Sequence, residues 1–383
     1  MLISQSTSYM KTIQAILLLS GMIIGVGMFG IPFSFVQAGF WLGTAELAVL
    51  AVVVWGLHRM YGEIVLATRE LHRLPGYVRI HLGRAAMPFV WFTTFFGVVG
   101  SLLIYLLVGS FFADAIAKIV WSGSTQFFWA VVLYGLQLIV SALPFRKEAA
   151  INSVITALFI GFVIGLIAFL LPAADTSHFT VIQFSGAFVP YGVLLFALSG
   201  GIVIPDVVTL VSRNAAATRR VILIGSILPA AVYALFAFAI VGISGAATSQ
   251  DAITGLAPFM NGGILILGSV IGFLAIITSY LPLGESFAAL LRLDFRLPKR
   301  LAWFAAATIP FILYLLGVHD FIRVMGTVGI FAVGIDIWLT VVMYHMIERR
   351  RGEGMRAFAY IWKAGLLVLA SAGVMYELYH IVL

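Results

Sequence analysis

The sequence has no cysteine and few charged residues. Only 10% of its 383 residues are Asp, Glu, Lys or Arg, whereas soluble domains carry about 25%. The lack of cysteine excludes disulfides, thiol nucleophiles and cysteine-ligated metal centres. The chain starts MLISQSTSYMK, without the basic region and small-residue cleavage site of a signal peptide, so we expect none. Hydrophobic residues make up 62% of the chain, which indicates an integral membrane protein.

Long apolar segments follow one another along the chain. A helix needs about 20 apolar residues to cross a bilayer. We therefore expect an all-α membrane protein with eleven transmembrane helices. They cover residues 12–36, 39–66, 86–113, 127–145, 149–171, 184–211, 218–243, 262–291, 300–317, 321–347 and 358–381. The basic stretch RELHRLPGYVRIHLG, between the second and third segments, is expected to lie along the membrane interface.

Lys and Arg residues are distributed unevenly between the two sides of these segments. With the N-terminus in the cytoplasm, 20 of the 22 fall on the cytoplasmic side, and only Lys118 and Arg323 fall outside. Cytoplasmic loops of membrane proteins carry an excess of positive charge. The distribution therefore predicts a cytoplasmic N-terminus and, after eleven crossings, an external C-terminus.

Two of the apolar segments are interrupted by glycine and proline. Residues 20–32 read SGMIIGVGMFGIP, and residues 190–207 read PYGVLLFALSGGIVIPDV. Inside a helix, each glycine costs roughly 1 kcal/mol relative to alanine and each proline about 3 kcal/mol. In lipid, a broken helix is tolerated only where protein or a water-filled cavity surrounds its free backbone groups. Close packing between helices is the alternative explanation for the glycines.

The two interrupted segments are the first and the sixth. Because the sixth segment comes five positions after the first, and five is odd, the two halves of the chain would lie in opposite orientations in the membrane. We therefore expect an inverted repeat within one domain, with residues 12–171 as the first half, 184–347 as the second, and 358–381 as an additional helix. Interrupted segments at corresponding places in two halves point to the binding site of a transporter.

Three motifs resemble those of the amino acid–polyamine–organocation superfamily, which has the LeuT-like fold of five plus five helices. GMIIGVGMFGIP is similar to the family opening G-x-x-x-G-x-G-x-x-x-x-P, FALSGGIVIP to the break F-x-x-S-x-G, and AIITSYLPLG to T-S-[FY]-L. The nearest families by resemblance are the amino acid/auxin permeases and the bacterial hydroxy/aromatic amino acid permeases. The resemblance implies a monomeric secondary transporter in the inner membrane that imports an amino acid by alternating access.

The resemblance places the amino acid at the two breaks. The N–H groups at a helix start suit a carboxylate, and the carbonyls at a helix end suit an ammonium group. The apolar residues beside the breaks suit a neutral, hydrophobic or aromatic side chain. The implied residues are Gly25, Val26 and Gly27 for the carboxylate, Ile23, Phe196, Ala197 and Ser199 for the ammonium group, and Met28, Phe196 and Leu283 for the side chain. Ser101 and Tyr105, one turn apart, either face this site or simply pack.

A candidate ion site lies in the eighth segment. Ala275, Thr278 and Ser279 fall at positions i, i+3 and i+4, on one helix face. Hydroxyl and carbonyl oxygens are the ligands that small hard cations prefer. The resemblance adds the carbonyls of Gly21 and Ile24 and implies one sodium ion as the coupling ion. The alternative is that the two hydroxyls bond to carbonyls of their own helix.

A second sodium ion is not expected. Met28 and Ala197 stand where relatives with two sodium ions have side-chain oxygens. The coupling ion could instead be a proton carried by Asp206 or Glu285, because ionisable groups inside a membrane are functional candidates. Either acid could also pair with Arg59 or Arg213 as a cytoplasmic gate. For Glu46 and Asp336 the sequence suggests no role.

Other function classes are disfavoured. The stretch around Ser199 faintly resembles the serine motif of rhomboid proteases, but His319, His345 and His380 lie in a loop or near segment ends, so no enzyme is expected. A channel filter needs a ring or repeat of ligands, and the chain has no four-fold repeat. Apart from the coupling ion, we expect no cofactor, and we expect no nucleic-acid partner.

Overall fold

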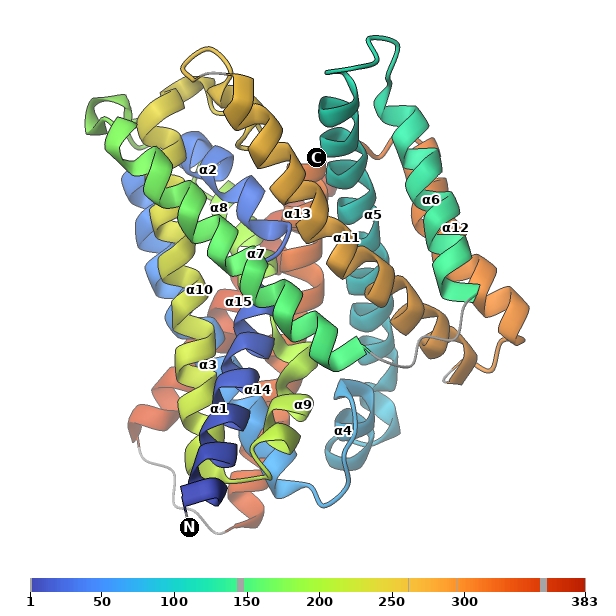
Figure 1. Cartoon of the computed structure of the whole chain (residues 1–383). Helices are drawn as coiled ribbons and strands as arrows, with labels where there is room; N and C mark the ends of the chain where they lie inside the picture. The colour runs from blue at the N-terminus through green and yellow to red at the C-terminus, as the bar shows by residue number, and fades with distance from the viewer. Residues whose placement is uncertain (1, 143–147, 261, 294, 352–356, 383) are drawn as a thin grey trace.

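The computed structural model is a bundle of α-helices (Figure 1). It describes all residues except 1, 143–147, 261, 294, 352–356 and 383. Arg146, Lys147 and Arg356, three of the residues behind the predicted orientation, and the end of the fourth segment therefore lie outside the described residues. The rest of the chain is helical and contains no strand, which confirms the predicted all-α class.

The elements follow one another with short connections. The helices are α1 (Leu2–Ile23), α2 (Gly27–Ala38), α3 (Phe40–Ala67), α4 (Leu74–His81), α5 (Met87–Ala117), α6 (Gln126–Ala142), α7 (Glu148–Leu170), α8 (Val189–Leu198), α9 (Ile204–Leu210), α10 (Ala215–Ser244), α11 (Gly262–Leu293), α12 (Lys299–Leu315), α13 (Phe321–Val328), α14 (Gly334–Arg350) and α15 (Ala357–Val382). The 3₁₀ turn η5 (Gly201–Val203) joins α8 to α9, and the π-helix η8 (Gly329–Val333) joins α13 to α14.

Every predicted apolar segment coincides with one helix or with a pair of helices. The first segment is broken between α1 and α2, which meet at 52°. The sixth is broken between α8 and α9. Among the described residues, seven helical stretches and the bent pair are long and apolar enough to cross a membrane. The number of eleven crossings stays a prediction.

The prolines lie where helices can accommodate them. Pro190 and Pro205 stand in the first turns of α8 and α9, where the missing N–H has no helical partner in any case. Pro32 lies inside α2 rather than at the end of the break, and Pro282 lies inside α11, which continues through it. Pro282 therefore does not interrupt α11.

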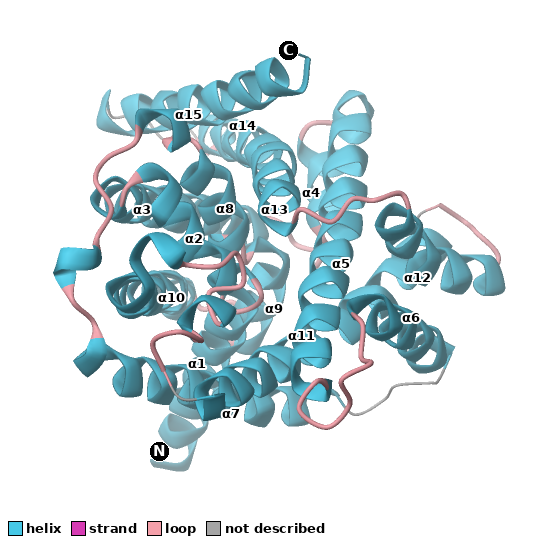
Figure 2. Cartoon of the chain, turned by 90° about the horizontal axis from the view of Figure 1, so that it is seen from above, coloured by secondary structure: helices cyan, strands magenta, loops and turns pink. Residues whose placement is uncertain are grey.

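The broken helices lie in the interior of the bundle. In the view from above, α2 and α8 are surrounded by α3, α10 and α13, while α6 and α12 lie at one side beside α5 and α11 (Figure 2). Glycines bring α8 against α13 and η8: a Cβ on Gly192 would lie 2.6 Å from the carbonyl oxygen of Gly326, and one on Gly329 would lie 2.8 Å from the nitrogen of Phe196. Small residues of this kind let backbones approach closely in membranes.

Candidate functional site

The two breaks contact each other. A Cβ added to Gly27, the first residue of α2, would lie only 2.7 Å from the Cα of Ala197 near the end of α8. A Cβ on Gly200 would lie 2.6 Å from the side chain of Ile23 at the end of α1. Glycine is therefore required at Gly27, where a side chain would collide with the backbone of α8, whereas at Gly200 the Ile23 side chain would have to move.

The predicted carboxylate site lies at the start of α2. The N–H groups of Met28 and Phe29 donate to the carbonyls of Gly25 and Val26, at 3.2 Å each, and so begin the α2 ladder. The N–H groups before that point have no partner within the helix. Gly25 faces open space, because the nearest atom to an added Cβ is 4.0 Å away. Gly25 is thus a buried residue with free space beside its backbone.

The predicted ammonium site is partly occupied by the protein itself. The hydroxyl of Tyr233, on α10, lies 2.5 Å from the carbonyl oxygen of Ile23 and 3.0 Å from that of Ala197. The carbonyl of Phe196 accepts the N–H of Ser199 at 3.1 Å. The sequence did not predict a role for Tyr233, because a single tyrosine in an apolar segment does not indicate which groups it contacts.

The predicted side-chain pocket draws on several helices. Met28 on α2 is buried, whereas Phe196 on α8, Leu283 on α11 and Ser101 on α5 keep part of their surface exposed. A pocket for the substrate side chain would have to form where α2, α5, α8 and α11 approach one another.

One predicted substrate residue contacts one predicted ion residue. The hydroxyl of Tyr105 on α5 forms a hydrogen bond with Ser279 on α11. Ala275 is buried on the same helix, and the side chain of Thr278 lies outside what the structure describes. The other half of the predicted ion site, Gly21 and Ile24, lies at the end of α1. Both α1 and α11 pack against α7.

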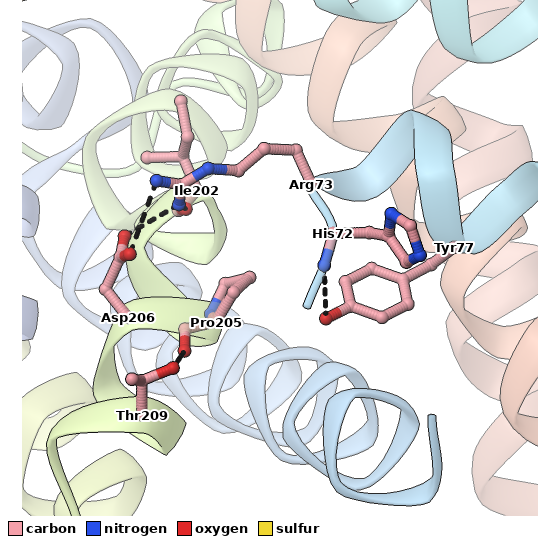
Figure 3. Close-up of polar contacts among 7 residues, drawn as sticks. All are labelled: His72, Arg73, Tyr77, Ile202, Pro205, Asp206 and Thr209. Carbon is pink, nitrogen blue, oxygen red and sulfur yellow. Dashed lines mark hydrogen bonds and ion pairs between the residues drawn. The ribbon is translucent and has the colours of Figure 1, made fainter. Parts of the chain in front are cut away.

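A salt bridge ties α9 to the loop before α4. Two nitrogens of the Arg73 guanidinium lie 2.6 and 3.3 Å from the carboxylate oxygens of Asp206, and Arg73 also donates to the carbonyl of Ile202 at 3.0 Å (Figure 3). Bidentate pairs of this kind fix geometry as well as charge. Asp206, the predicted gate or proton carrier, is thus held by Arg73.

Arg59 and Arg213, the partners suggested for Asp206 or Glu285, make other contacts. Arg213 donates to the carbonyls of Val65 and Thr68 at 2.8 and 2.6 Å and so caps the end of α3. Arg59 lies over the ring of Trp55, 6.0 Å from its centroid. The Asp206 partner was missed because Arg73 lies 133 positions away in the sequence.

A buried histidine supports the second break. The N–H of Gly200 donates to Nε2 of His58 at 3.2 Å, and Nδ1 of His58 lies 2.9 Å from the hydroxyl of Ser226 on α10. Because Nε2 accepts, Nδ1 carries the proton and donates to Ser226. His58 on α3 therefore links the α8–α9 break to α10.

The other acids in the spans have individual surroundings. Glu63 pairs with Arg219 at 2.6 Å, and the carboxylate of Asp336 accepts a hydrogen bond from Thr93 at 2.8 Å. In the part of the chain that the structure describes, Oε2 of Glu46 is buried without a hydrogen-bond partner.

Comparison with known families identifies the chain. The sequence profile of the tryptophan/tyrosine permease family matches residues 8–380. The chain belongs to this family. The permease is therefore a multi-pass membrane transporter and not an enzyme. A search of curated protein sequences gave no significant match.

Solved structures similar to this permease are transporters of low sequence identity. MhsT in complex with L-phenylalanine has a TM-score of 0.63 and 13% identity, covering 95% of this chain and 97% of that one. Inward-facing Mhp1, of the nucleobase-cation-symport-1 family, has a TM-score of 0.66 and 12% identity, covering 97% and 90%. A manganese transporter of Eremococcus coleocola has a TM-score of 0.61 and 11% identity, covering 96% and 94%.

These similarities confirm the LeuT-like fold of the permease. The finer placement beside the amino acid/auxin permeases and the hydroxy/aromatic amino acid permeases stays a prediction, as does the division into two inverted halves.

Proposed function

We propose that this permease imports an aromatic amino acid across the inner membrane by alternating access. The observation that carries the proposal is the direct contact between two broken helices, at Gly27 and Ala197, in a chain of the tryptophan/tyrosine permease family. Broken helices that meet in the interior of a bundle form the binding sites of many transporters. The phenylalanine bound to MhsT supports the same class of substrate.

In this proposal, the backbone at the breaks binds the polar part of the amino acid. The N–H groups at Gly25–Gly27 receive the carboxylate, and the carbonyls at the end of α8 receive the ammonium group. Half-helix ends can hold both charges without a charged side chain. Phe196, Leu283 and Tyr105 are the partly exposed side chains that would line the pocket for the aromatic ring.

We further propose coupling to one sodium ion between α1 and α11. The ligands would be the backbone oxygens of Gly21, Ile24 and Ala275 and the hydroxyls of Thr278 and Ser279. Because Ser279 also bonds to Tyr105, ion binding would influence the substrate pocket, and substrate would raise ion affinity by the same factor. The alternative is a proton on Asp206 or Glu285; for Asp206, protonation would require release from Arg73.

From the distribution of Lys and Arg, we propose that the N-terminus lies in the cytoplasm and the C-terminus outside. We also propose that the permease is a monomer. Consistent with an odd number of crossings, α1 begins at the lower end of the bundle in Figure 1 and the end of α15 lies toward the upper end.

A thermal-shift screen of the purified permease with the twenty amino acids, in sodium and in potassium buffer, tests the substrate proposal. We expect L-tryptophan, L-tyrosine or L-phenylalanine to raise the unfolding temperature most, because a bound ligand stabilises the folded state. Stabilisation by small polar or charged amino acids alone would contradict it.

Uptake into proteoliposomes tests the coupling ion. An inward sodium gradient at equal pH should drive accumulation, and Ser279→Ala should weaken the sodium dependence while leaving the unfolding temperature nearly unchanged. A response to a pH gradient in sodium-free choline, with no response to sodium, would favour Asp206 or Glu285 instead.

A further inference from the structure

Tyr233 lies fully buried in α10, and its hydroxyl stands between the two breaks. It contacts the carbonyl of Ile23, the last residue of α1, and the carbonyl of Ala197, close to the end of α8. One side-chain hydroxyl therefore joins two backbone carbonyls that lie at the ends of α1 and α8.

The chemistry of this position suits a hydroxyl. Two carbonyls that converge on one point would also attract a small cation or an ammonium group. In this structure the donor at that point is instead the hydroxyl of Tyr233. A hydroxyl has one proton to donate, so Tyr233 holds both carbonyls by sharing that proton between them.

The same hydroxyl joins elements that the proposed transport cycle has to keep in register. Ile23 lies two positions before Gly25, the first of the residues proposed for the substrate carboxylate, and Ala197 is one of the residues proposed for the ammonium group. The distance between these two half-sites must match the short spacing between the carboxylate and the ammonium group of an α-amino acid. Nothing in the helical ladders fixes that distance, because both ladders end at the breaks.

We propose that Tyr233 is a positioning residue of the transport site, whose hydroxyl couples the α1–α2 break to the α8–α9 break and so sets the spacing of the two half-sites. For the identity of the substrate, this inference rests on the proposed function. It also has a consequence for coupling: the hydroxyl fills the place where a second cation would bind between the breaks.

Tyr233→Phe removes the hydroxyl and keeps the ring. The matched control is Tyr191→Phe, because Tyr191 is also a buried tyrosine whose hydroxyl donates to a carbonyl, that of Leu369, at 2.9 Å on α15. We expect Tyr233→Phe to weaken binding of the tightest-binding aromatic amino acid at least tenfold, and Tyr191→Phe to change it less than twofold.

A second measurement does not depend on the substrate. Because the chain has no cysteine, Leu198→Cys introduces a single thiol beside the break, at a position only 1% exposed. In native membranes, this thiol should react with a maleimide at least fivefold faster when combined with Tyr233→Phe, and at an unchanged rate when combined with Tyr191→Phe.

The two measurements separate the possible failures. Faster labelling together with weaker binding supports the inference. An unchanged labelling rate in the Tyr233→Phe background overturns it, whatever the affinity. If the unsubstituted permease binds none of the three aromatic amino acids, the proposed function fails, while the labelling rates still decide the role of Tyr233.

Discussion

At the level of single residues, the glycines of the first break have two different roles. Gly27 is required by packing, since a Cβ there would lie 2.7 Å from Ala197. Gly25 has room for a side chain, and its φ is not among the positive ones. A methyl group at Gly25 would therefore enter open space beside the proposed carboxylate site without disturbing the contact between the breaks.

Gly25→Ala should accordingly lower substrate affinity by about tenfold, a free energy of roughly 1.4 kcal/mol, with little change in the unfolding temperature. Isothermal titration and thermal unfolding of the purified variant measure the two quantities. Gly27→Ala is the control, and it should lower the unfolding temperature because of the collision with α8. Wild-type affinity in Gly25→Ala would argue against the carboxylate assignment.

The sequence revealed the breaks because glycine and proline act locally, on their own helix. It did not reveal Tyr233, His58 or Arg73, whose roles depend on partners far along the chain. The contact between Gly200 and His58 spans 142 positions. No spacing rule for helices or loops predicts a contact of that kind, so these residues required the packed structure.

His58 should stabilise the second break measurably. His58→Leu would leave the N–H of Gly200 and the hydroxyl of Ser226 without their partner, and a buried unsatisfied group costs about 1–3 kcal/mol. We expect a clearly lower unfolding temperature for His58→Leu than for His58→Gln, whose side chain retains an acceptor and a donor. Equal loss in both variants would mean that ring packing, and not the hydrogen bonds, is what matters.

At the level of elements, α4 forms within the stretch predicted to lie along the membrane interface between the second and third spans. Its residues Tyr77, Val78 and His81 are buried against the protein, and it packs on α5 and α14. The sequence predicted no helix for this stretch, and a periodic pattern does not reveal whether an apolar face meets lipid or protein. The π-helix η8 was not predicted at all, because its extra residue leaves no mark in the apolar run.

The docking of α4 should depend on pH. Nε2 of His81 lies 2.8 Å from the hydroxyl of Thr68 at the end of α3, and burial, together with the charge of Arg350, lowers the pKa of His81. A histidine with a lowered pKa stabilises the docked state above the usual histidine value of about 6.5, and this stabilisation is lost as the pH falls through the lowered value.

Hydrogen exchange of the α4 amides, compared between neutral and mildly acidic pH, measures this effect. We expect faster exchange at acidic pH in the unsubstituted permease and a much weaker pH dependence in His81→Gln. If exchange in α4 were equally fast at both pH values in the unsubstituted chain, His81 would not contribute to docking.

At the level of the whole molecule, alternating access would move the broken helices and their neighbours α3 and α10 against the remaining helices. The Arg73–Asp206 pair lies across that division. Asp206 is on α9, in the broken sixth segment, whereas Arg73 precedes α4, which packs on α5 and α14. The Glu63–Arg219 pair, in contrast, joins α3 to α10 within the moving group.

Opening of the site on the α9 side should therefore break the Arg73–Asp206 pair and leave the Glu63–Arg219 pair intact. Arg73→Gln removes the restraint and should raise the population of the open state, whereas Arg219→Gln should not. In both pairs the arginine side chain is largely exposed to solvent. Exposed ion pairs contribute about 0–1 kcal/mol, so Arg73→Gln should raise the equilibrium constant for opening by up to about fivefold. Val207→Cys, at a fully buried position of α9, reports the open state through its rate of reaction with a maleimide. Equal rates in the Arg73→Gln and Arg219→Gln backgrounds would mean that α9 does not move relative to α4, and that the division of the molecule into two moving groups lies elsewhere.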